Sequence, residues 1–246
     1  WTTDSTNTRL LERPTPDEGV AVLLAERQTG GRGRRGRAWA SPLAANIYLS
    51  LARSFRGGLA RLPGLSLVAG VATAEALHAL GFTGARLKWP NDLVVPEGRG
   101  MRKLGGLLVE GGGEHAGPAR AVIGLGLNVR MPDAFAAAID QPWIDLATLA
   151  GAPVSRNRVV AALLAHWLPA LAQFDAEGLD GFLPRYAALD ALAGREVAVD
   201  TTGGTRSGIA LGLAADGALR VRFAEGEQRV HSGEVSVRAT TARETA

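Results

Sequence analysis

The sequence predicts an α+β fold, with a mixed, mostly antiparallel sheet flanked by helices and a small all-β unit after it. Apolar residues recur at helical spacing over residues 65–80 and 160–174, and short strand-like runs stand between these two helices. After residue 190 only short strands split by glycine turns remain, which is typical of a small β-barrel. We therefore divide the 246 residues into a domain of residues 1–190 and a C-terminal domain of residues 191–246.

The first domain is predicted to mix short strands with helices. Capping side chains at residues 4–8 begin a first helix, and the two prolines of residues 14–16 end it. The glycine-rich residues 111–118 are expected to join two strands as a hairpin, and Pro169 to kink a long helix that opens at Asn157. The other expected elements are strands at 20–25, 46–52, 85–89, 93–95, 104–110 and 121–129, helices at 65–80 and 144–150, and C-terminal strands at 196–200, 208–213, 218–223, 228–231 and 234–238.

Composition excludes several kinds of chemistry. The chain has no cysteine, which excludes disulfides, thiolate metal sites and a cysteine nucleophile, and its four histidines are too scattered to indicate a zinc site. A formal net charge of +3 does not indicate a chain-wide surface for a polyanion. We find no apolar run of membrane-span length and no secretory leader, and we expect a cytoplasmic protein without membrane contact.

The most distinctive stretch alternates arginine and glycine over residues 30–37. Its four arginines and four glycines follow Gln28 and precede Trp39. Such a segment buries little apolar surface, but its guanidinium and backbone N–H groups can surround an anion. By itself it is either a solvated basic loop that binds nucleic acid or a loop that folds over a phosphate-bearing ligand.

A second stretch, Lys-Trp-Pro-Asn-Asp at residues 88–92, places polar side chains at the end of a strand. Pro90 cannot continue a central strand, so Asn91 and Asp92 stand in an exposed turn. Together with Lys88 they form a cluster of mixed charge. The cluster is either a capped turn with a solvated lysine or part of a polar site.

Two further stretches combine a polar residue with glycines in strands. Lys103 opens a strand in which Gly105 and Gly106 leave space for a ligand against the backbone, although a single lysine at a strand start is most often a surface charge. Residues 124–128, Gly-Leu-Gly-Leu-Asn, remove side chains from one face of another strand. That face can receive either a flat ligand or a neighbouring backbone.

In this order, these stretches resemble the motifs of the biotin protein ligases over nearly the whole chain. The matching segments are Asp-Ser-Thr-Asn at residues 4–7, Gly-Arg-Gly-Arg-Arg-Gly-Arg at 31–37, Lys-Trp-Pro-Asn-Asp at 88–92, Arg-Lys-Leu-Gly-Gly-Leu-Leu-Val-Glu at 102–110 and Gly-Leu-Gly-Leu-Asn-Val at 124–129. The resemblance implies the biotin–lipoate ligase fold, which is similar to class II synthetases, with an SH3-like C-terminal domain. Because the motifs begin at Asp4, it implies the form without an N-terminal DNA-binding domain.

The resemblance also implies the reaction. Biotin and Mg·ATP would give biotinyl-5′-AMP and pyrophosphate, and a lysine of a biotin carboxyl carrier protein would then take the biotin. Neither step needs a covalent enzyme nucleophile, which suits a chain without cysteine. Homodimers through the central sheet occur in this family, and no DNA partner is expected for this chain.

Roles for individual residues follow from the same resemblance. Lys103, Asp92 and Arg34 are the catalytic candidates: Lys103 for the reacting oxygens, Asp92 for the acceptor lysine and Arg34 for the phosphate. Arg238 would reach the triphosphate from the C-terminal domain. The full set implied for biotin and nucleotide is Ser5, Thr6, Asn7, Gln28, Gly31, Arg32, Gly33, Arg34, Arg37, Trp39, Lys88, Asn91, Lys103, Gly105, Gly106, Gly124, Gly126, Asn128 and Arg238.

Three alternatives remain open from the sequence. A lipoate ligase or octanoyltransferase shares the fold and the carrier-lysine chemistry, and the arginine-rich loop favours biotin over it. A nucleic-acid-binding module would spread its basic residues over a face with several aromatic residues, whereas only Trp39 lies near the loop. A regulatory relative without activity would be expected to lack Lys103, Asn91 or Asp92, and all three are present.

Overall fold

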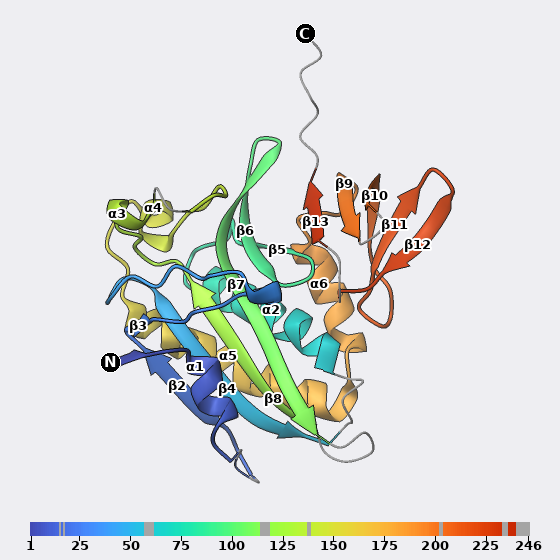
Figure 1. Ribbon diagram of the computed structural model, residues 1–246. Helices are drawn as coiled ribbons and strands as arrows, with labels where there is room; N and C mark the ends of the chain where they lie inside the picture. Colours follow the sequence, from blue (N-terminus) through green and yellow to red (C-terminus); the bar gives the residue numbers. More distant parts are fainter. Residues whose placement is uncertain are drawn as a thin grey trace.

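Two antiparallel sheets organise the fold (Figure 1). The computed structural model describes residues 1–14, 16, 18–56, 62–113, 119–136, 139–201, 204–232 and 236–239. The larger sheet has six strands, in the spatial order β2 (Ala21–Ala25), β4 (Ile47–Phe55), β8 (Ala119–Leu127), β7 (Gly100–Gly113), β6 (Asp92–Glu97) and β5 (Arg86–Lys88). The smaller sheet has five, in the order β12 (Gly226–Val230), β11 (Leu219–Phe223), β10 (Gly204–Leu213), β9 (Glu196–Thr201) and β13 (Ser236–Ala239).

The predicted α+β class is confirmed, and every strand pair within the six-stranded sheet is antiparallel. The parallel pair of strands lies outside this sheet and joins β1 (Thr2–Thr3) to β3 (Arg27–Gln28). The helices are α1 (Thr6–Leu11), α2 (Leu62–Ala79), α3 (Asp133–Ala136), α4 (Leu146–Ala150), α5 (Arg156–Glu177) and α6 (Leu183–Leu189), with short 3-10 helices η1 (Arg34–Gly36) and η3 (Asp180–Phe182).

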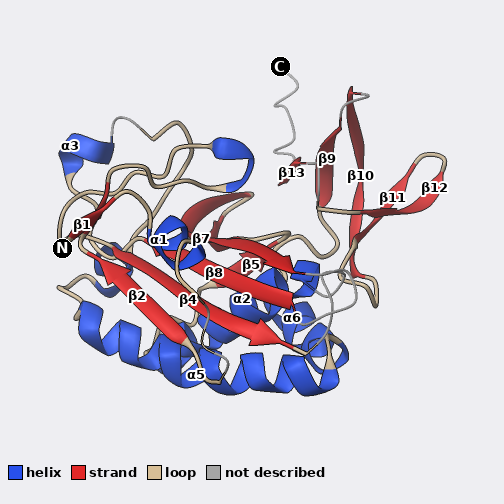
Figure 2. Cartoon of the chain, turned by 60° about the horizontal axis from the view of Figure 1, so that its bottom comes forward, coloured by secondary structure: helices blue, strands red, loops and turns tan. Residues whose placement is uncertain are grey.

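The two faces of the six-stranded sheet are covered differently. Helices α2 and α5 cover one face, and α1 lies on the other face together with the N-terminal loops (Figure 2). Strand β8 follows this division residue by residue, because successive side chains of a strand point to opposite faces. Ile123 and Leu125 belong to the large core on the helix side, whereas Val122 packs with Leu10 of α1 in a small second core. The face under α1 is where the glycines of β8 lie.

Helix α5 runs through Pro169 as a single element, in keeping with the long helix expected here, and the kink at this proline stays a prediction. Its inward face packs against α2, and Trp167 donates a hydrogen bond from Nε1 to Thr73 Oγ1 of α2 at 2.9 Å. By length and composition alone, α5 is the one helix of the described residues that could cross a membrane, which corrects the expectation of no such run. The buried residues of this helix are Val159, Leu163, Trp167, Ala170, Leu171 and Phe174.

The C-terminal sheet shares its core with the first domain. Val197, Val221 and Phe223 belong to the same cluster of buried side chains as the residues between α2 and the large sheet. Hydrogen bonds also cross between the two parts, from Trp89 Nε1 to the carbonyl of Gly217 at 3.1 Å, and from the amide of Ala191 to the carbonyl of Leu87 at 2.8 Å. The segment next to residue 190 therefore packs directly against strand β5.

Most predicted elements are present with shifted ends. The hairpin of β7 and β8 is confirmed, and pairing continues to Gly113 and Ala119, whereas residues 114–118 of the expected turn lie outside the described residues. Helices α3 and α6 and the short strands β1 and β3 were not predicted. Helix α6 carries Pro184 in its first turn, where a proline costs no helical hydrogen bond, so this proline begins a helix rather than breaking one.

Candidate active site

A cluster of buried polar side chains forms where α1 meets the large sheet. We call Ser5, Thr6, Asn7, Gln28 and Ser50 the polar wall. Ser5 caps α1 by accepting a hydrogen bond from the amide of Thr8 at 3.4 Å, which places the next two residues in the first turn of the helix. All of the polar wall except Gln28 is at most 4% exposed.

Hydrogen bonds join four members of the polar wall, Thr6, Asn7, Gln28 and Ser50, into one network. Gln28 Oε1 accepts from the amide of Thr6 at 2.8 Å and from its hydroxyl at 3.0 Å. Ser50 Oγ donates to Asn7 Oδ1 at 2.6 Å and lies 2.7 Å from Thr6 Oγ1. Ser50 was not singled out from the sequence. It lies directly opposite Gly124 in the register of β4 and β8, a relation that only the pairing of the strands reveals.

Three glycines form a surface without side chains beside the polar wall, and we call Gly106, Gly124 and Gly126 the glycine floor. A Cβ atom on Gly124 would lie 2.3 Å from Asn7 Oδ1, and one on Gly126 would lie 2.4 Å from the indole of Trp39. Neither position has room for another residue. Gly106 pairs with Gly126 across β7 and β8, so the floor is continuous over the two strands.

Gly105 points to the other face of the sheet. A Cβ atom on it would lie 2.8 Å from the carbonyl oxygen of Gly126, and its next neighbour is Leu127. This glycine allows close approach of two strands and does not belong to the glycine floor.

A β-bulge turns Lys103 into the site. Leu93 pairs with Gly105 and Val94 with Lys103, so Leu104 is an additional residue in β7. In a regular strand of the same sequence, Lys103 would lie three residues from Gly106 and would point to the helix side, because the side chains of a strand alternate. A bulge changes the direction of a side chain in this way. It places Lys103 on the face of the sheet that carries Asp92.

Asp92 lies between two lysines. Its Oδ1 is 2.7 Å from Lys103 Nζ, and its Oδ2 is 3.9 Å from Lys88 Nζ. Lys103 Nζ is also 5.4 Å from the centre of the Trp39 ring. The three charged side chains are less than a quarter exposed, so their interaction is screened less than it would be at the surface. The two stretches singled out from the sequence, residues 88–92 and the strand that Lys103 opens, thus contribute side chains to a single charged cluster.

The arginine-rich stretch folds back on itself, and we call residues 30–39 the arginine loop. Arg32 and Ala38 form an antiparallel bridge, and the amide of Gly33 donates to the carbonyl of Arg37 at 2.7 Å. Arg35 at the tip has a φ of 57°, in the left-handed region that non-glycine residues seldom adopt. At its base, a Cβ atom on Gly31 would lie 2.9 Å from Ser41 Oγ, so the loop begins close to its own end.

Arg34 points from the arginine loop toward both parts of the chain. Its guanidinium donates to Asn91 Oδ1 at 3.5 Å and to the carbonyl of Ser232, between β12 and β13. Burial lowers the pKa of Arg34, and the positive charges of Arg35 and Arg37 lower it further. A half-buried cation among like charges favours a nearby anion.

Two of the implied nucleotide contacts have structural partners. The side-chain amide of Asn91 donates to the carbonyl of Leu107 at 2.6 Å. Asn128 is 4% exposed, and its Nδ2 donates to the carbonyl of Lys103 at 3.3 Å and to that of Ile144 at 3.1 Å. Asn128 therefore holds the backbone from which Lys103 extends.

The remaining sequence candidates are distributed around this cluster. Trp39 lies over the glycine floor, and its indole Nε1 is buried without a hydrogen-bond partner. The side chain of Arg37 is exposed. Arg238 lies in β13, opposite Ala198, and its side chain is outside the described part of the structure.

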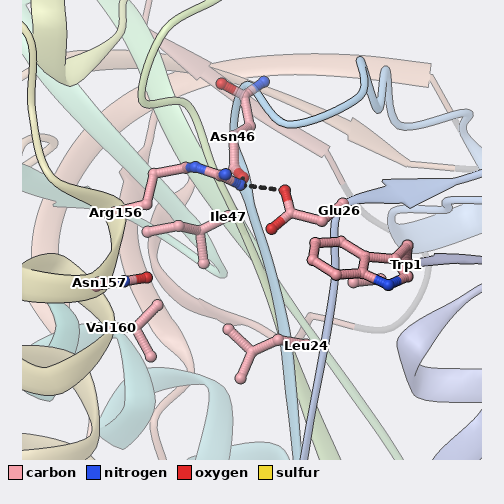
Figure 3. A pocket seen from close by; sticks show the side chains of 9 residues that line it. Trp1, Leu24, Glu26, Asn46, Ile47, Arg156, Asn157 and Val160 are labelled. Carbon is pink, nitrogen blue, oxygen red and sulfur yellow. Dashed lines mark hydrogen bonds and ion pairs between the residues drawn. The ribbon is translucent and has the colours of Figure 1, made fainter.

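A cleft of about 230 Å³ lies elsewhere, between the edge strand β2 and the start of α5 (Figure 3). An ion pair of 2.5 Å between Arg156 and Glu26 crosses it. None of the residues predicted to bind a ligand lines this cleft. The residues that line it are Trp1, Leu24, Ala25, Glu26, Asn46, Ile47, Arg156, Asn157 and Val160.

The arrangement defines an enzyme that binds a small carboxylate and a phosphate-bearing second substrate. The flat indole of Trp39 lies over the glycine floor, the polar wall offers buried hydrogen-bonding groups at one end, and cations stand at the other. Among the described residues near the floor no nucleophile is paired with a base in the manner of covalent catalysis. Cations that neutralise negatively charged substrate oxygens are suited to a direct reaction between two bound substrates.

Comparisons with known proteins agree with this class. The chain belongs to the biotin/lipoate A/B protein ligase family, whose model matches residues 2–128, and the model of the biotin protein ligase C-terminal domain matches residues 193–238. Its activity is that of a biotin protein ligase, an ATP-dependent biotin–[acetyl-CoA-carboxylase] ligase.

Individual relatives match over most of their length. The bifunctional ligase/repressor BirA of Escherichia coli is 39% identical over 96% of this chain and 72% of its own. The biotin–[acetyl-CoA-carboxylase] ligase of Paracoccus denitrificans is 33% identical over 95% of this chain and 97% of its own. The structure of the Aquifex aeolicus biotin protein ligase in complex with biotin and ATP matches with a TM-score of 0.81 and 28% identity, over 97% of each chain.

Proposed function

We propose that the chain performs two steps at the site formed by the polar wall, the glycine floor and Lys103. In the first, a carboxylate oxygen of biotin attacks the α-phosphorus of ATP, and pyrophosphate leaves to give biotinyl-5′-AMP. In the second, the ε-amine of a carrier-protein lysine attacks the acyl carbon, AMP leaves, and the amine loses a proton. The observation that carries this proposal is the Lys103–Asp92 pair of 2.7 Å at the edge of the glycine floor.

The polar wall would hold the ureido ring of biotin. A ureido group offers one acceptor oxygen and two N–H donors, and Ser5, Thr6 and Asn7 offer hydroxyl and amide groups that match both kinds. Because Ser50 and Gln28 already hold the side chains of Thr6 and Asn7, these two lose little side-chain freedom when the ligand binds. The glycine floor beside them would take the flat, apolar part of the ligand once the indole of Trp39, which lies over it, moves aside.

Lys103 and Asp92 would act in successive steps. The ammonium of Lys103 would neutralise the carboxylate and phosphate oxygens as charge develops on them. Once Lys103 turns to the ligand, the carboxylate of Asp92 becomes available to the acceptor lysine, whose amine is nearly all protonated at neutral pH. Lys88, 3.9 Å from Asp92, would then remain its cationic neighbour.

The arginine loop and the C-terminal sheet would enclose the nucleotide. The guanidinium of Arg34 reaches toward Asn91 and Ser232. A phosphate bound there would take the place of the Ser232 carbonyl as its hydrogen-bond acceptor and would add a negative charge. Within the described part of the chain, no group of three or more His, Asp or Glu side chains could hold a metal ion. Mg²⁺ would accordingly enter bound to the phosphates of ATP and keep most of its water. A role of Arg238 on the triphosphate stays a prediction.

Biotin-dependent ATP–pyrophosphate exchange tests the first step. The wild-type chain should exchange label when biotin is present and should not when lipoate or octanoate replaces it. Lys103→Ala should lose exchange while keeping its fold, as seen by circular dichroism. Exchange with lipoate but not with biotin would instead favour the lipoate ligase alternative. Transfer to a carrier domain, compared with the same domain whose acceptor lysine is arginine, tests the second step.

The acceptor is the biotin carboxyl carrier protein of acetyl-CoA carboxylase, in keeping with the ligase of Paracoccus denitrificans. A homodimer through the central sheet remains a proposal. The edge strand β2 supports it, because its outward side chains Val22 and Leu24 are 36% and 45% exposed. Light scattering coupled to gel filtration, with and without biotin and ATP, would measure it. A cytoplasmic location likewise remains a proposal.

A further inference from the structure

Glu110 is a charged residue in an otherwise apolar part of the sheet. It pairs with Val122 across β7 and β8, and Val122 packs with Leu10 in the core under α1. A carboxylate in such a place is costly unless it is fully hydrogen-bonded. Its side chain is 26% exposed.

Each oxygen of Glu110 has its own partner. Oε1 accepts from Arg32 Nη2 at 2.9 Å, and Oε2 accepts from Asn7 Nδ2 at 2.8 Å. Arg32 belongs to the arginine loop and Asn7 to the polar wall. One carboxylate therefore joins the two parts of the site that the proposed function assigns to the phosphate and to the ureido ring.

The contact to Asn7 fixes which way its side-chain amide points. Glu110 accepts from the nitrogen, Ser50 donates to the oxygen at 2.6 Å, and the carbonyl of Leu108 accepts from the nitrogen at 3.2 Å. An amide placed between an acceptor and a donor in this way has one favourable orientation. That orientation decides whether Asn7 offers biotin a donor or an acceptor.

The contact to Arg32 fixes the first half of the arginine loop. Arg32 also donates to Thr8 Oγ1 at 2.9 Å, so its guanidinium is held from both α1 and β7. Arg32 bridges to Ala38, which positions the return of the loop as well. Trp39 follows at once and lies over the glycine floor.

We infer that Glu110 is a positioning residue for adenylate formation, one that holds the Asn7 amide in its biotin-binding orientation and anchors the arginine loop through Arg32. The inference rests on the proposed roles of Asn7 and Arg32. Glu110 itself touches no reacting atom, and its effect is on the binding of biotin and on closure of the loop.

Glu110→Gln tests this with almost no change in volume. A glutamine keeps one acceptor oxygen, so its NH₂ group must face either the guanidinium of Arg32 or the amide nitrogen of Asn7. In the exchange assay, the KM for biotin should rise roughly tenfold, the effect of one charge-assisted hydrogen bond, and the KM for ATP should rise by a smaller factor, because only one side of the loop that encloses the nucleotide is loosened. Trypsin cleavage of the arginine loop in the presence of biotin and ATP should accelerate by a similar factor.

Glu97→Gln is the matched control. Glu97 pairs with Arg102 at 2.8 Å on the same sheet, is 59% exposed and contacts neither the polar wall nor the arginine loop. It should leave both KM values and loop cleavage unchanged. Glu110→Asp, which keeps the charge but reaches one partner at most, should show a smaller rise in the KM for biotin than Glu110→Ala.

Two results would overturn the inference. One is a Glu110→Gln variant with wild-type KM for biotin and wild-type loop cleavage. The other is an equal rise in the KM for biotin and the KM for ATP together with a lower melting temperature, which a general structural role would produce. Failure of the proposed function is distinguishable, because the wild-type chain would then show no biotin-dependent exchange at all.

Discussion

The polar wall and the arginine loop face the same ligand site but are held in different ways. Ser50, Thr6 and Asn7 are buried and hydrogen-bonded to one another, and their positions are set by the register of the sheet and by the cap of α1. The arginine loop carries four arginines, of which Arg32 and Arg34 hydrogen-bond to the rest of the protein, and Trp39 at its end lies over the glycine floor. In the proposed function, recognition of biotin is thus built into the sheet, whereas retention of the intermediate depends on a few long side chains.

The largest effect is expected where the sheet leaves no freedom. Gly124→Val would place its Cβ within 2.3 Å of Asn7 Oδ1, so either the wall or the strand must move. Biotin-dependent exchange should fall at least about a hundredfold, equivalent to roughly 3 kcal/mol, the upper range for overpacking. Gly100→Ala, whose new Cβ would lie 3.5 Å from the carbonyl of Glu97, should retain wild-type exchange. Normal KM for biotin in Gly124→Val would show that the wall is not rigid.

Asp92→Asn tests the group between the wall and the loop. The substitution removes the base proposed for the acceptor lysine but keeps the shape of the side chain. Transfer from preformed biotinyl-AMP to the carrier should slow by roughly a hundredfold or more, the range for general base catalysis, while adenylate formation changes less. Rapid-quench measurement of the two half-reactions separates them. Equal losses in both would assign Asp92 to positioning Lys103 alone.

Arg34→Gly tests the loop itself. The variant loses the contacts to Asn91 and to the carbonyl of Ser232. Release of biotinyl-AMP should accelerate roughly tenfold, the value of one charge-assisted hydrogen bond, and the rate of its formation should change by less than about threefold. Filter binding with labelled biotin and ATP measures retention. An intermediate held as tightly as in wild type would contradict the division into wall and loop.

Arg120→Ala tests how far the wall depends on α1. The guanidinium of Arg120, on β8, donates to the carbonyls of Leu10 and Arg13 at the C-terminal end of this helix. Losing this cap should lower the free energy of unfolding by about 1 kcal/mol. Urea denaturation measures the change, with Arg53→Ala, which instead loses its pair with Asp175, for comparison. An unchanged free energy of unfolding would mean that the small core under α1 is enough to hold this helix in place.

The smallest effect is expected at Asp190, beside the C-terminal sheet that Arg34 contacts. Burial raises the pKa of Asp190, and its Oδ2 has no hydrogen-bond partner. The folded state therefore binds the proton more tightly than the unfolded state, and wild type loses stability as pH rises from about the ordinary pKa of 3.8 through the higher folded value.

Asp190→Asn cannot titrate, so its stability relative to wild type should increase over the same pH window. The gain should stay below about 1 kcal/mol, because many other contacts hold this segment. Chemical denaturation at several pH values measures the difference between the two proteins. A difference that is constant with pH would place the carboxylate in contact with solvent.

Local features of the chain were enough to predict part of the site. The cap at Ser5, the arginine loop and the strand end before Asp92 all depend on residues close in sequence, and their signals survive without knowledge of the fold. Ser50 carries no local signal, and Glu110, although it ends the motif at residues 102–110, carries none for its contacts. They matter because strand pairing brings them opposite Gly124 and Val122, and that register is set by the whole sheet.

Two other residues show what tertiary contacts add to a local signal. Asn128 stands in a segment that resembles a ligand-binding motif, and its Nδ2 also donates to the carbonyls of Lys103 and Ile144, which lie in other segments. Its contact with the nucleotide stays a prediction. Pro169 lies inside α5 as expected, and the helix, which packs against α2, continues through it.

The bulge at Leu104 makes the geometry of the site depend on backbone pairing as well as on residue identity. If β7 alternated regularly from Gly106 back to Lys103, every reactive group would still be in the sequence, yet Lys103 would point toward the core under α2 and away from Asp92. The bulge, in which two steps of β7 oppose one step of β6, returns this side chain to the face that carries Asp92. The position of the ammonium is therefore set by one irregular step between two strands, which the identity of the lysine alone does not reveal.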